Sequence, residues 1–313
     1  MAENAERLTV TIGETMALVT PAPPAPLATA KTFEIHPAGA ESNVALFLAA
    51  LNHRVAWASR LGADPLGDRV LDFIAAGGVD TSLVDRPSTH PTGTFFKDPA
   101  PAGASTTVHY YRAGSAASTM DRGFAESLPW NDIRLVHISG VNPALSPECA
   151  AMTDAVIELA HRHGCTVSLD VNHRPALWSA ERAAPILAGY ARRCDLVLVG
   201  RDEAERLWGT ATAEAIAAFL PEPSQLVVKD AEIGASAHVH GADPVFVPSP
   251  TVDVVEPVGA GDAFAAGYLS GWLDDLPVAD RLAEGHRMAG VALRSVADVP
   301  PHIFTDPDFA RRR

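Results

Sequence analysis

Segments typical of β-strands and of α-helices alternate along the chain, and this alternation limits the fold more than any other feature. Residues 8–12 and 55–61 are rich in β-branched and apolar residues, as buried strands are. A helical pattern follows each of them, the first ending at Leu51 and the second running from Pro65 to Gly77. Such alternation favours parallel strands, and it therefore predicts an α/β fold with a mostly parallel central sheet. Further strands are expected at residues 133–139, 165–170, 196–199 and 225–229, and a last helix is expected from about Pro277 to Ala297.

Composition excludes several classes of partner. The 313 residues include 24 Lys and Arg against 38 Asp and Glu, a formal net charge of −14. A chain this acidic is not expected to bind nucleic acid or an anionic membrane through bulk charge. No apolar run approaches the length that spans a membrane, and residues 1–4 lack the basic and apolar regions of a secretory leader. We therefore expect neither a nucleic-acid partner nor a membrane partner.

The cysteines indicate a reducing compartment. Cys149, Cys165 and Cys194 are odd in number and widely spaced, without the close pairing of a metal site. Three buried thiols in a cytoplasmic protein are the simplest interpretation. The twelve histidines form no pattern typical of a zinc site.

Residues 252–272 carry the clearest chemical signal. Gly259, Ala260 and Gly261 form a stretch with almost no side chain, and a helical pattern begins at Asp262. Bare amides at a helix N-terminus suit a phosphate or a developing anion. Asp262 could cap this helix, or it could accept a proton from a bound hydroxyl. Taken alone, the stretch would be read as an ordinary turn and N-cap.

In its context, the run Val-Gly-Ala-Gly-Asp-Ala-Phe from Val258 to Phe264 resembles the C-terminal signature of the ribokinase-like (pfkB) carbohydrate kinases. In that family the Gly-Ala-Gly amides form an anion hole and the Asp is the catalytic base. The resemblance implies a three-layer sandwich with a small β-sheet lid, forming one domain over residues 1–313. Lid segments are expected at about 14–37 and 92–115, with a homo-oligomer formed through the lid. The resemblance also implies that the protein uses ATP and Mg2+. It does not decide whether a monovalent cation is needed as well.

A second motif resembles the sugar-binding signature of the same family. Residues 38–45 read Ala-Gly-Ala-Glu-Ser-Asn-Val-Ala, and the Gly-Ala-Glu-x-Asn form is similar to the 2-keto-3-deoxygluconate kinase branch. By this resemblance Gly39, Ala40 and Asn43 bind the sugar. Without the resemblance, the same residues would be read as the turn and cap of a helix N-terminus.

The segments 92–97 and 106–112 are rich in β-forming residues and are separated by a turn at 99–103, which predicts a hairpin. Tyr110 and Arg112 match the Tyr-x-Arg pattern of the same branch. A guanidinium can hold the carboxylate of a sugar acid in a forked pair, whereas a neutral sugar needs no such cation. Phe95 stands where relatives tend to carry Tyr, so one hydroxyl contact is absent.

Nucleotide-binding residues are expected at the ends of later strands, where open α/β sheets bind ligands. Asn172 and Arg174 match an Asp-x-Asn-x-Arg motif, and Arg174 could meet either the substrate carboxylate or a phosphate. Lys229 and Gly234 match a Lys-x-Gly-x-x-Gly motif. Glu203 could orient magnesium through water, or it could simply favour its helix dipole. Three positions depart from the family pattern: Gly200 replaces Asn, Ala231 replaces Gly, and Glu256-Pro257 replaces Asp-Thr.

These observations predict an ATP-dependent kinase that phosphorylates the terminal hydroxyl of a sugar acid, with 2-keto-3-deoxygluconate as substrate and its 6-phosphate as product. One alternative is a kinase of the same family for 2-keto-3-deoxygalactonate, fructose or ribose. Another is a non-catalytic sugar or nucleotide sensor on the same fold, because fold does not determine function. A dehydrogenase is disfavoured, since the first strand leads into Gly13-Glu14-Thr15 rather than a Gly-x-Gly-x-x-Gly turn.

Overall fold

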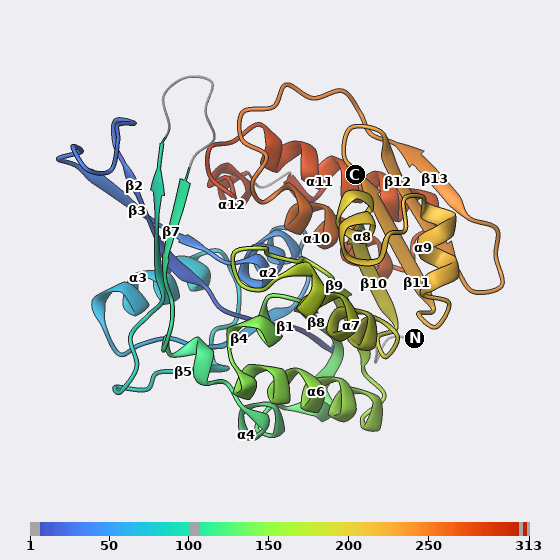
Figure 1. Cartoon of the computed structure of the whole chain (residues 1–313), viewed down its shortest axis with the longest axis horizontal. Helices are drawn as coiled ribbons and strands as arrows, with labels where there is room; N and C mark the ends of the chain where they lie inside the picture. Colours follow the sequence, from blue (N-terminus) through green and yellow to red (C-terminus); the bar gives the residue numbers. More distant parts are fainter. Residues whose placement is uncertain (1–6, 100–106, 307–308, 312–313) are drawn as a thin grey trace.

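A nine-stranded sheet runs through the middle of the computed structural model, which describes residues 7–99, 107–306 and 309–311 (Figure 1). Its strand order is β13-β12-β11-β10-β9-β8-β1-β4-β5. All pairs from β11 to β5 are parallel, whereas β12 and β13 run antiparallel at one edge. The predicted mostly parallel sheet is therefore confirmed. The strands are β1 (Leu8–Ile12), β4 (Val55–Arg60), β5 (Val84–Asp85), β8 (Ile133–Ser139), β9 (Thr166–Asp170), β10 (Leu196–Gly200), β11 (Gln225–Asp230), β12 (Gly234–Val239) and β13 (Val245–Pro248).

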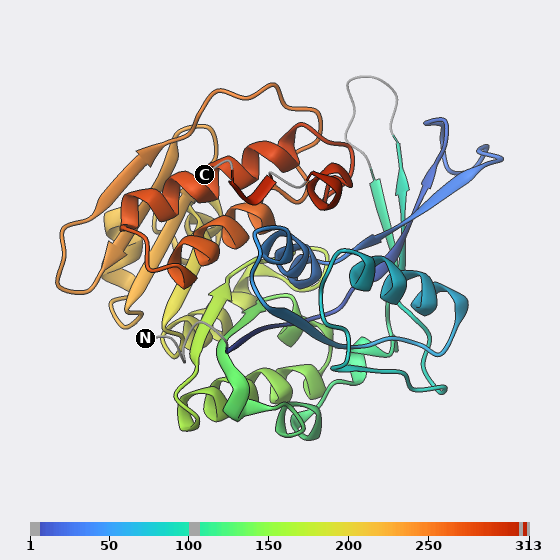
Figure 2. The same ribbon diagram turned by 180° about the vertical axis from the view of Figure 1, so that it is seen from behind.

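Helices cover both faces of this sheet, which gives the three layers expected from the sequence (Figures 1 and 2). Two separate buried clusters fill the spaces between the layers. One face carries α2 (Ala40–Ala50), α3 (Pro65–Ala76), α10 (Ala260–Leu273), α11 (Val278–Leu293) and α12 (His302–Thr305). The other carries α4 (Arg122–Glu126), α5 (Asn142–Leu145), α6 (Pro147–Arg162), α7 (Ala180–Ala191), α8 (Arg201–Trp208) and α9 (Ala213–Phe219). Short 3-10 turns lie at Ala117–Thr119, Trp130–Asp132 and Phe309–Arg311.

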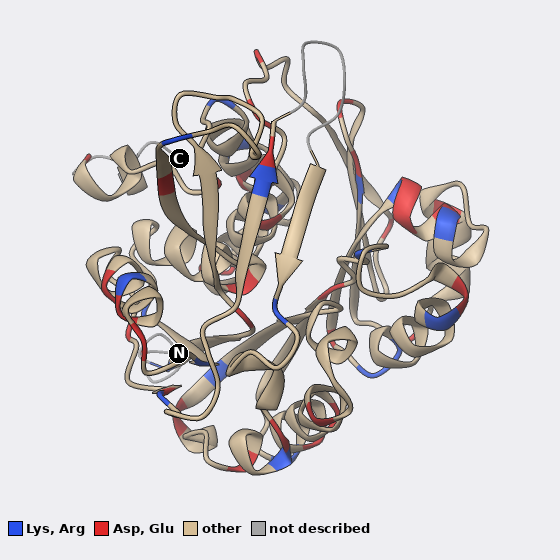
Figure 3. Cartoon of the chain, turned by 60° about the vertical axis from the view of Figure 1, so that its left-hand side comes forward, with Lys and Arg blue, Asp and Glu red and all other residues tan. Residues whose placement is uncertain are grey.

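Charged residues avoid the middle of the central strands and gather near strand ends and on the outer helices (Figure 3). Asp170, Lys229 and Asp230 are at the carboxyl ends of β9 and β11. Among the helices built from described residues, none combines the length and apolar character needed to cross a bilayer.

A second, four-stranded sheet projects beside the first, with the order β3-β2-β6-β7. The predicted hairpin is confirmed, since β6 pairs antiparallel with β7, but residues 100–103 of its predicted turn lie outside the described residues. β2 joins the hairpin by pairing parallel to β6 and antiparallel to β3. The strands are β2 (Met16–Pro21), β3 (Phe33–Ala38), β6 (Thr94–Asp98) and β7 (Thr107–Tyr111).

The packing of α10 against α11 positions the glycine-rich stretch. The aromatic residues that recur at every fourth position of α10 all join the buried cluster, with Phe264 and Tyr268 buried and Trp272 partly buried. A Cβ at Gly267 would lie 2.4 Å from the Glu284 carbonyl oxygen, so the two helices approach each other more closely than a side chain allows.

Two helix boundaries in this region differ from expectation. α10 begins at Ala260 rather than at Asp262, because the left-handed Gly259 already serves as its N-cap. α11 ends at Leu293, not at residue 297, and the backbone there accepts a hydrogen bond from the Val255 amide. Residues 252–255 lie in a loop, outside the strands.

We expect Gly267→Ala to lower the free energy of unfolding by about 1–3 kcal/mol, because the added methyl group forces α10 and α11 apart. The matched control is Gly189→Ala in α7, where a Cβ would have no neighbour within 4 Å. That change should stabilise the chain by roughly 0.5–1 kcal/mol through helix propensity. Urea unfolding of both variants measures the difference, and equal effects at the two sites would contradict the close packing.

Candidate active site

The carboxyl ends of β9, β10 and β11 and the start of α10 enclose a cavity of about 460 Å³. Ligands bind at this edge of open parallel sheets because the connecting loops diverge there. The cavity collects most of the residues that the sequence singled out for phosphate chemistry. They are Asn172, Arg174, Glu203, Lys229, Gly259, Gly261 and Asp262.

The N-terminus of α10 presents unobstructed amides to this cavity. Gly259 has φ +83°, and a Cβ there would lie 2.9 Å from the Asp298 carbonyl oxygen, so only glycine fits comfortably. A Cβ on Gly261 would lie 3.8 Å from Lys229 Nζ, which places the ammonium group beside the first turn. The helix is 14 residues long, and its free amides and dipole favour an anion at this point.

Asp262 is a buried acid at the cavity. Its side chain accepts a hydrogen bond of 2.9 Å from Asn43 Nδ2 of α2. Burial raises the pKa of Asp262 to about 7, although the charge of Arg174 and the Asn43 hydrogen bond act in the opposite direction. A carboxylate that titrates near neutrality can both accept and release a proton at physiological pH. The geometry therefore suits general-base chemistry.

Lys229 and Glu203 belong to one charged cluster. Lys229 Nζ donates to Asp170 Oδ2 at 2.6 Å. Burial opposes the ammonium charge, yet the attraction of Asp170 leaves the pKa of Lys229 raised. The Glu203 carboxylate accepts from the backbone amides of His173 and Gly200, the latter at 3.2 Å. Burial, together with the nearby charge of Asp170, raises the pKa of Glu203 to about 7.

The donor set of this cluster can hold a metal ion only indirectly. Within residues 7–99, 107–306 and 309–311, no three His, Cys, Asp or Glu side chains converge as a metal cage. Glu203 already accepts two backbone amides, which favours contact through water. Mg2+ is commonly held by one or two carboxylates, waters and substrate phosphates, and the residues present fit that mode.

The structure explains two of the three departures from the motif patterns. Ala231 adopts φ +42°, a left-handed conformation that favours glycine, so the backbone keeps the shape of the motif despite the substitution. Gly200 caps α8, where its amide donates to Glu203. Nothing in the structure explains Glu256 at its position.

Gly234 is the one predicted nucleotide residue that does not line the cavity. It opens β12 with φ +151°, and a Cβ there would lie 2.5 Å from the Val247 carbonyl oxygen. The close approach of β13 therefore explains why glycine is found at this position. Ala260 likewise does not line the cavity with its side chain, although it contributes the first residue of α10.

The predicted sugar-binding residues are divided between the start of α2 and the second sheet. Gly39 caps α2, Ala40 begins it, and Asn43 reaches Asp262 from its first turn. On the second sheet, Phe95 stacks on Tyr110 with ring centroids 5.5 Å apart. The Arg112 guanidinium lies 5.8 Å from the centroid of the Tyr110 ring.

Three carboxylates at this site were not predicted. Glu14 forms an ion pair with Arg112. Glu41 accepts from Ser139 Oγ at 2.5 Å, and burial raises its pKa to about 7. Burial also raises the pKa of Asp298, which packs on Gly259. Glu14 follows the first strand and Glu41 is part of the quoted Gly-Ala-Glu-x-Asn motif, so both had a signal, whereas Asp298 had none.

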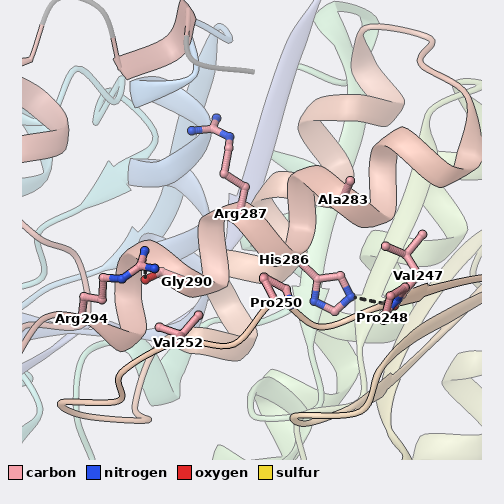
Figure 4. Close-up of a pocket in the computed structure, with 9 residues that line it drawn as sticks. All are labelled: Val247, Pro248, Pro250, Val252, Ala283, His286, Arg287, Gly290 and Arg294. Atoms are coloured by element: carbon pink, nitrogen blue, oxygen red, sulfur yellow. Dashed lines mark hydrogen bonds between the residues drawn. The ribbon is translucent and has the colours of Figure 1, made fainter.

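A second cavity, of about 330 Å³, lies between residues 247–252 and α11 (Figure 4). Its walls include Val247, Pro248, Pro250 and Val252, which make one side apolar. His286 points to this side and contacts the Val247 carbonyl oxygen at 3.1 Å, whereas Arg287 points away from it in Figure 4. Because Val252 lines this cavity and Pro257 lines the first, a single short loop borders both.

Comparison with known proteins gives a consistent result. The model of the "pfkB family carbohydrate kinase" matches residues 6–301. A 2-dehydro-3-deoxygluconokinase of Bacillus subtilis is 36% identical over 299 residues, covering 93% of this chain and 90% of the relative. A 2-dehydro-3-deoxygalactonokinase of Haloferax volcanii is 32% identical, covering 90% and 89%. The crystal structure of a PfkB protein from Polaromonas sp. JS666 is 35% identical, with a TM-score of 0.85 over 93% of this chain and 97% of that one.

The conformation of Ala231 generates a prediction. Ala231→Gly should raise the free energy of unfolding by roughly 0.5–1 kcal/mol, because glycine adopts a positive φ without strain. The control is Ala151→Gly at an exposed position of α6, where the same change should cost about 1 kcal/mol. Thermal and urea unfolding would compare the two, and a loss of stability at both positions would contradict the strain at Ala231.

Proposed function

Since this chain belongs to the pfkB family of carbohydrate kinases, we propose that it transfers the γ-phosphoryl group of ATP to the terminal hydroxyl of a sugar acid. The observation that carries this proposal is the position of Asp262. It is buried at the first turn of α10 beside bare amides, and it is joined through Asn43 to the residues expected to hold a sugar.

In the proposed mechanism, Asp262 accepts the proton of the substrate hydroxyl while that oxygen attacks the γ-phosphorus atom of ATP. The bond from this phosphorus atom to the bridging oxygen breaks, and ADP leaves. The amides of the first turn of α10, together with Lys229 and Arg174, stabilise the negative charge on the transferring group. Closure of the second sheet over the sugar would exclude water, which otherwise competes as acceptor.

Two cavities support the proposed positions of ATP and Mg2+. The phosphates belong in the cavity that Lys229 and the start of α10 share. The second cavity, beside His286, has room for a base, and the short loop between the two cavities supports a single extended nucleotide across both. Mg2+ would be held chiefly by phosphate and water near Glu203, where it would neutralise phosphate charge.

The proposed substrate is 2-keto-3-deoxygluconate, also written 2-dehydro-3-deoxygluconate. Support comes from Arg112 and Tyr110 at the sugar side and from the relative in Bacillus subtilis that carries this activity in its name. The relative in Haloferax volcanii makes 2-keto-3-deoxygalactonate the next candidate. The two acids differ in the configuration of one hydroxyl, whereas both keep the carboxylate that Arg112 would bind.

The proposal also covers the domain organisation, the oligomeric state and the cellular location of the protein. We treat the chain as one kinase domain whose lid segments are about 14–37 and 92–115. A homo-oligomer through the lid is supported by exposed aromatic side chains on the second sheet, Phe33 at 43% and Tyr111 at 65% exposed. A cytoplasmic location is supported by the free, buried state of Cys149, Cys165 and Cys194.

Turnover of a substrate panel tests the proposal. ADP release with ATP and Mg2+ should be strong with the two keto-deoxy acids and weak with fructose and ribose.

Asp262→Asn should abolish turnover while leaving sugar-acid binding largely intact, since the amide cannot accept the proton. Asp280→Asn, at an exposed position of α11, is the matched control and should retain activity. Near-normal turnover in Asp262→Asn would overturn the assignment of the base, and silence of the wild type with all sugars would favour a sensor.

The pH dependence gives an independent test of the base. Because Asp262 must be deprotonated to act, kcat/KM should fall as the pH drops through about 7. Asn43→Leu removes a hydrogen bond that favours the charged carboxylate, so the pKa rises further and the acidic limb should move to higher pH. A pH–rate profile of both proteins measures this shift. If the acidic limb of the kcat/KM profile stayed at the same pH in Asn43→Leu, a group other than Asp262 would control that limb.

A further inference from the structure

The four chain segments that connect the two sheets meet at one buried residue, Glu14. Glu14 itself lies in the segment between β1 and β2. A Cβ on Gly39, which follows β3, would lie 2.5 Å from the Glu14 carbonyl oxygen. A Cβ on Gly93, which precedes β6, would lie 2.6 Å from Glu14 Oε1. The segment after β7 supplies Arg112 and Ser115, which both contact the Glu14 carboxylate.

The contacts of Glu14 are strong and almost completely shielded from water. Oε2 accepts from Arg112 Nε at 2.7 Å and also contacts Nη2 of the same guanidinium. Oε1 accepts from Ser115 Oγ at 2.5 Å. The side chain of Glu14 is 1% exposed and that of Arg112 is 11% exposed. An ion pair at this depth fixes geometry, and either partner left alone would be costly.

The stereochemistry of the pair determines which part of Arg112 remains for a ligand. A guanidinium has five N–H groups in a rigid plane, and Glu14 occupies the edge formed by Nε and Nη2. The edge formed by Nη1 and the second Nη2 hydrogen can still donate two hydrogen bonds to the carboxylate of a ligand. The centroid of the Tyr110 ring lies 5.8 Å from the guanidinium carbon, so this ring also limits how the guanidinium plane of Arg112 can turn.

We propose that Glu14 is a positioning residue for substrate selection: it holds one edge of Arg112 so that the other edge binds the carboxylate of a sugar acid. Because Glu14 also lies where the connecting segments meet, the orientation of Arg112 is tied to the hinge of the second sheet. The inference rests on the proposed function and deepens it, since it identifies what makes Arg112 selective.

A double-mutant cycle tests this role. Glu14→Gln keeps the size of the side chain and an acceptor for Ser115 but loses the charge that orients Arg112. We expect kcat/KM for 2-keto-3-deoxygluconate to fall about 10- to 100-fold, mainly through KM, as for loss of a charge-assisted hydrogen bond. The low activity with fructose should change by less than about twofold, because a neutral sugar does not use Arg112.

The same change in the Arg112→Met background separates positioning from general damage. If Glu14 acts through Arg112, Glu14→Gln should cause almost no further loss of kcat/KM for the sugar acid there. It should also restore the melting temperature that Arg112→Met lowers, because the unpaired buried carboxylate is gone. Independent, multiplicative losses in the two backgrounds would overturn the proposal, as would equal losses for acid and neutral sugars.

Two further variants serve as controls for the local structure. Ser115→Ala removes one hydrogen bond to Glu14 but leaves the ion pair, so it should affect sugar-acid KM less than Glu14→Gln does. Glu14→Asp retains the charge and should recover part of the lost kcat/KM. If Ser115→Ala lowered kcat/KM for the sugar acid as much as Glu14→Gln does, the effect would come from the packing of the connecting segments and not from the orientation of Arg112. Wild-type turnover of the substrate panel, measured alongside, tests the proposed function separately, because it does not depend on the coupling between Glu14 and Arg112.

Discussion

The hydrogen bond from Asn43 to Asp262 joins two helices that start at the same edge of the sheet, and the geometry of the site depends on it. α2 begins at Ala40 and α10 at Ala260, and a glycine caps each of them. The bond places the residues expected to bind sugar beside those expected to bind phosphate. It also connects α2, which follows β3 of the second sheet, to the first turn of α10.

Carboxylates outnumber cations around this edge, and burial decides how they behave. Asp262, Glu41 and Glu203 each have a pKa raised to about 7, with burial as the largest cause. Mutual repulsion adds to the effect, because Asp262 raises the pKa of Glu41 and Asp170 raises that of Glu203. An acidic chain can therefore keep an anion-binding site, because part of its local negative charge is titrated near neutral pH and Lys229 and Arg174 face the same cavity.

Much of the architecture could be predicted from local patterns. The buried parallel strands are short apolar runs, and the helices that follow them carry clear caps, as at Asp64 and Ser146. Among the helix boundaries, those of α10 and α11 were wrong because they depend on tertiary contacts that periodicity does not contain. Gly259 in a left-handed cap starts α10 early, and the Val255 amide bonds to the carbonyl at the end of α11.

The site was predicted to the extent that its residues belong to contiguous motifs. Asp262, Lys229 and Arg174 each occur in such a run, and the cavity brings them together. Gly234 also occurs in such a run, but a side chain there is excluded by the close approach of β13 and not by a ligand. Local sequence cannot distinguish a glycine that makes room for a ligand from one that makes room for a neighbouring strand. Glu14 is a single acid beside a strand, and its importance arises only when distant segments converge on it. Arg112 on its own would bind any anion of suitable size, and only a fixed partner on one edge makes its remaining edge a directional site.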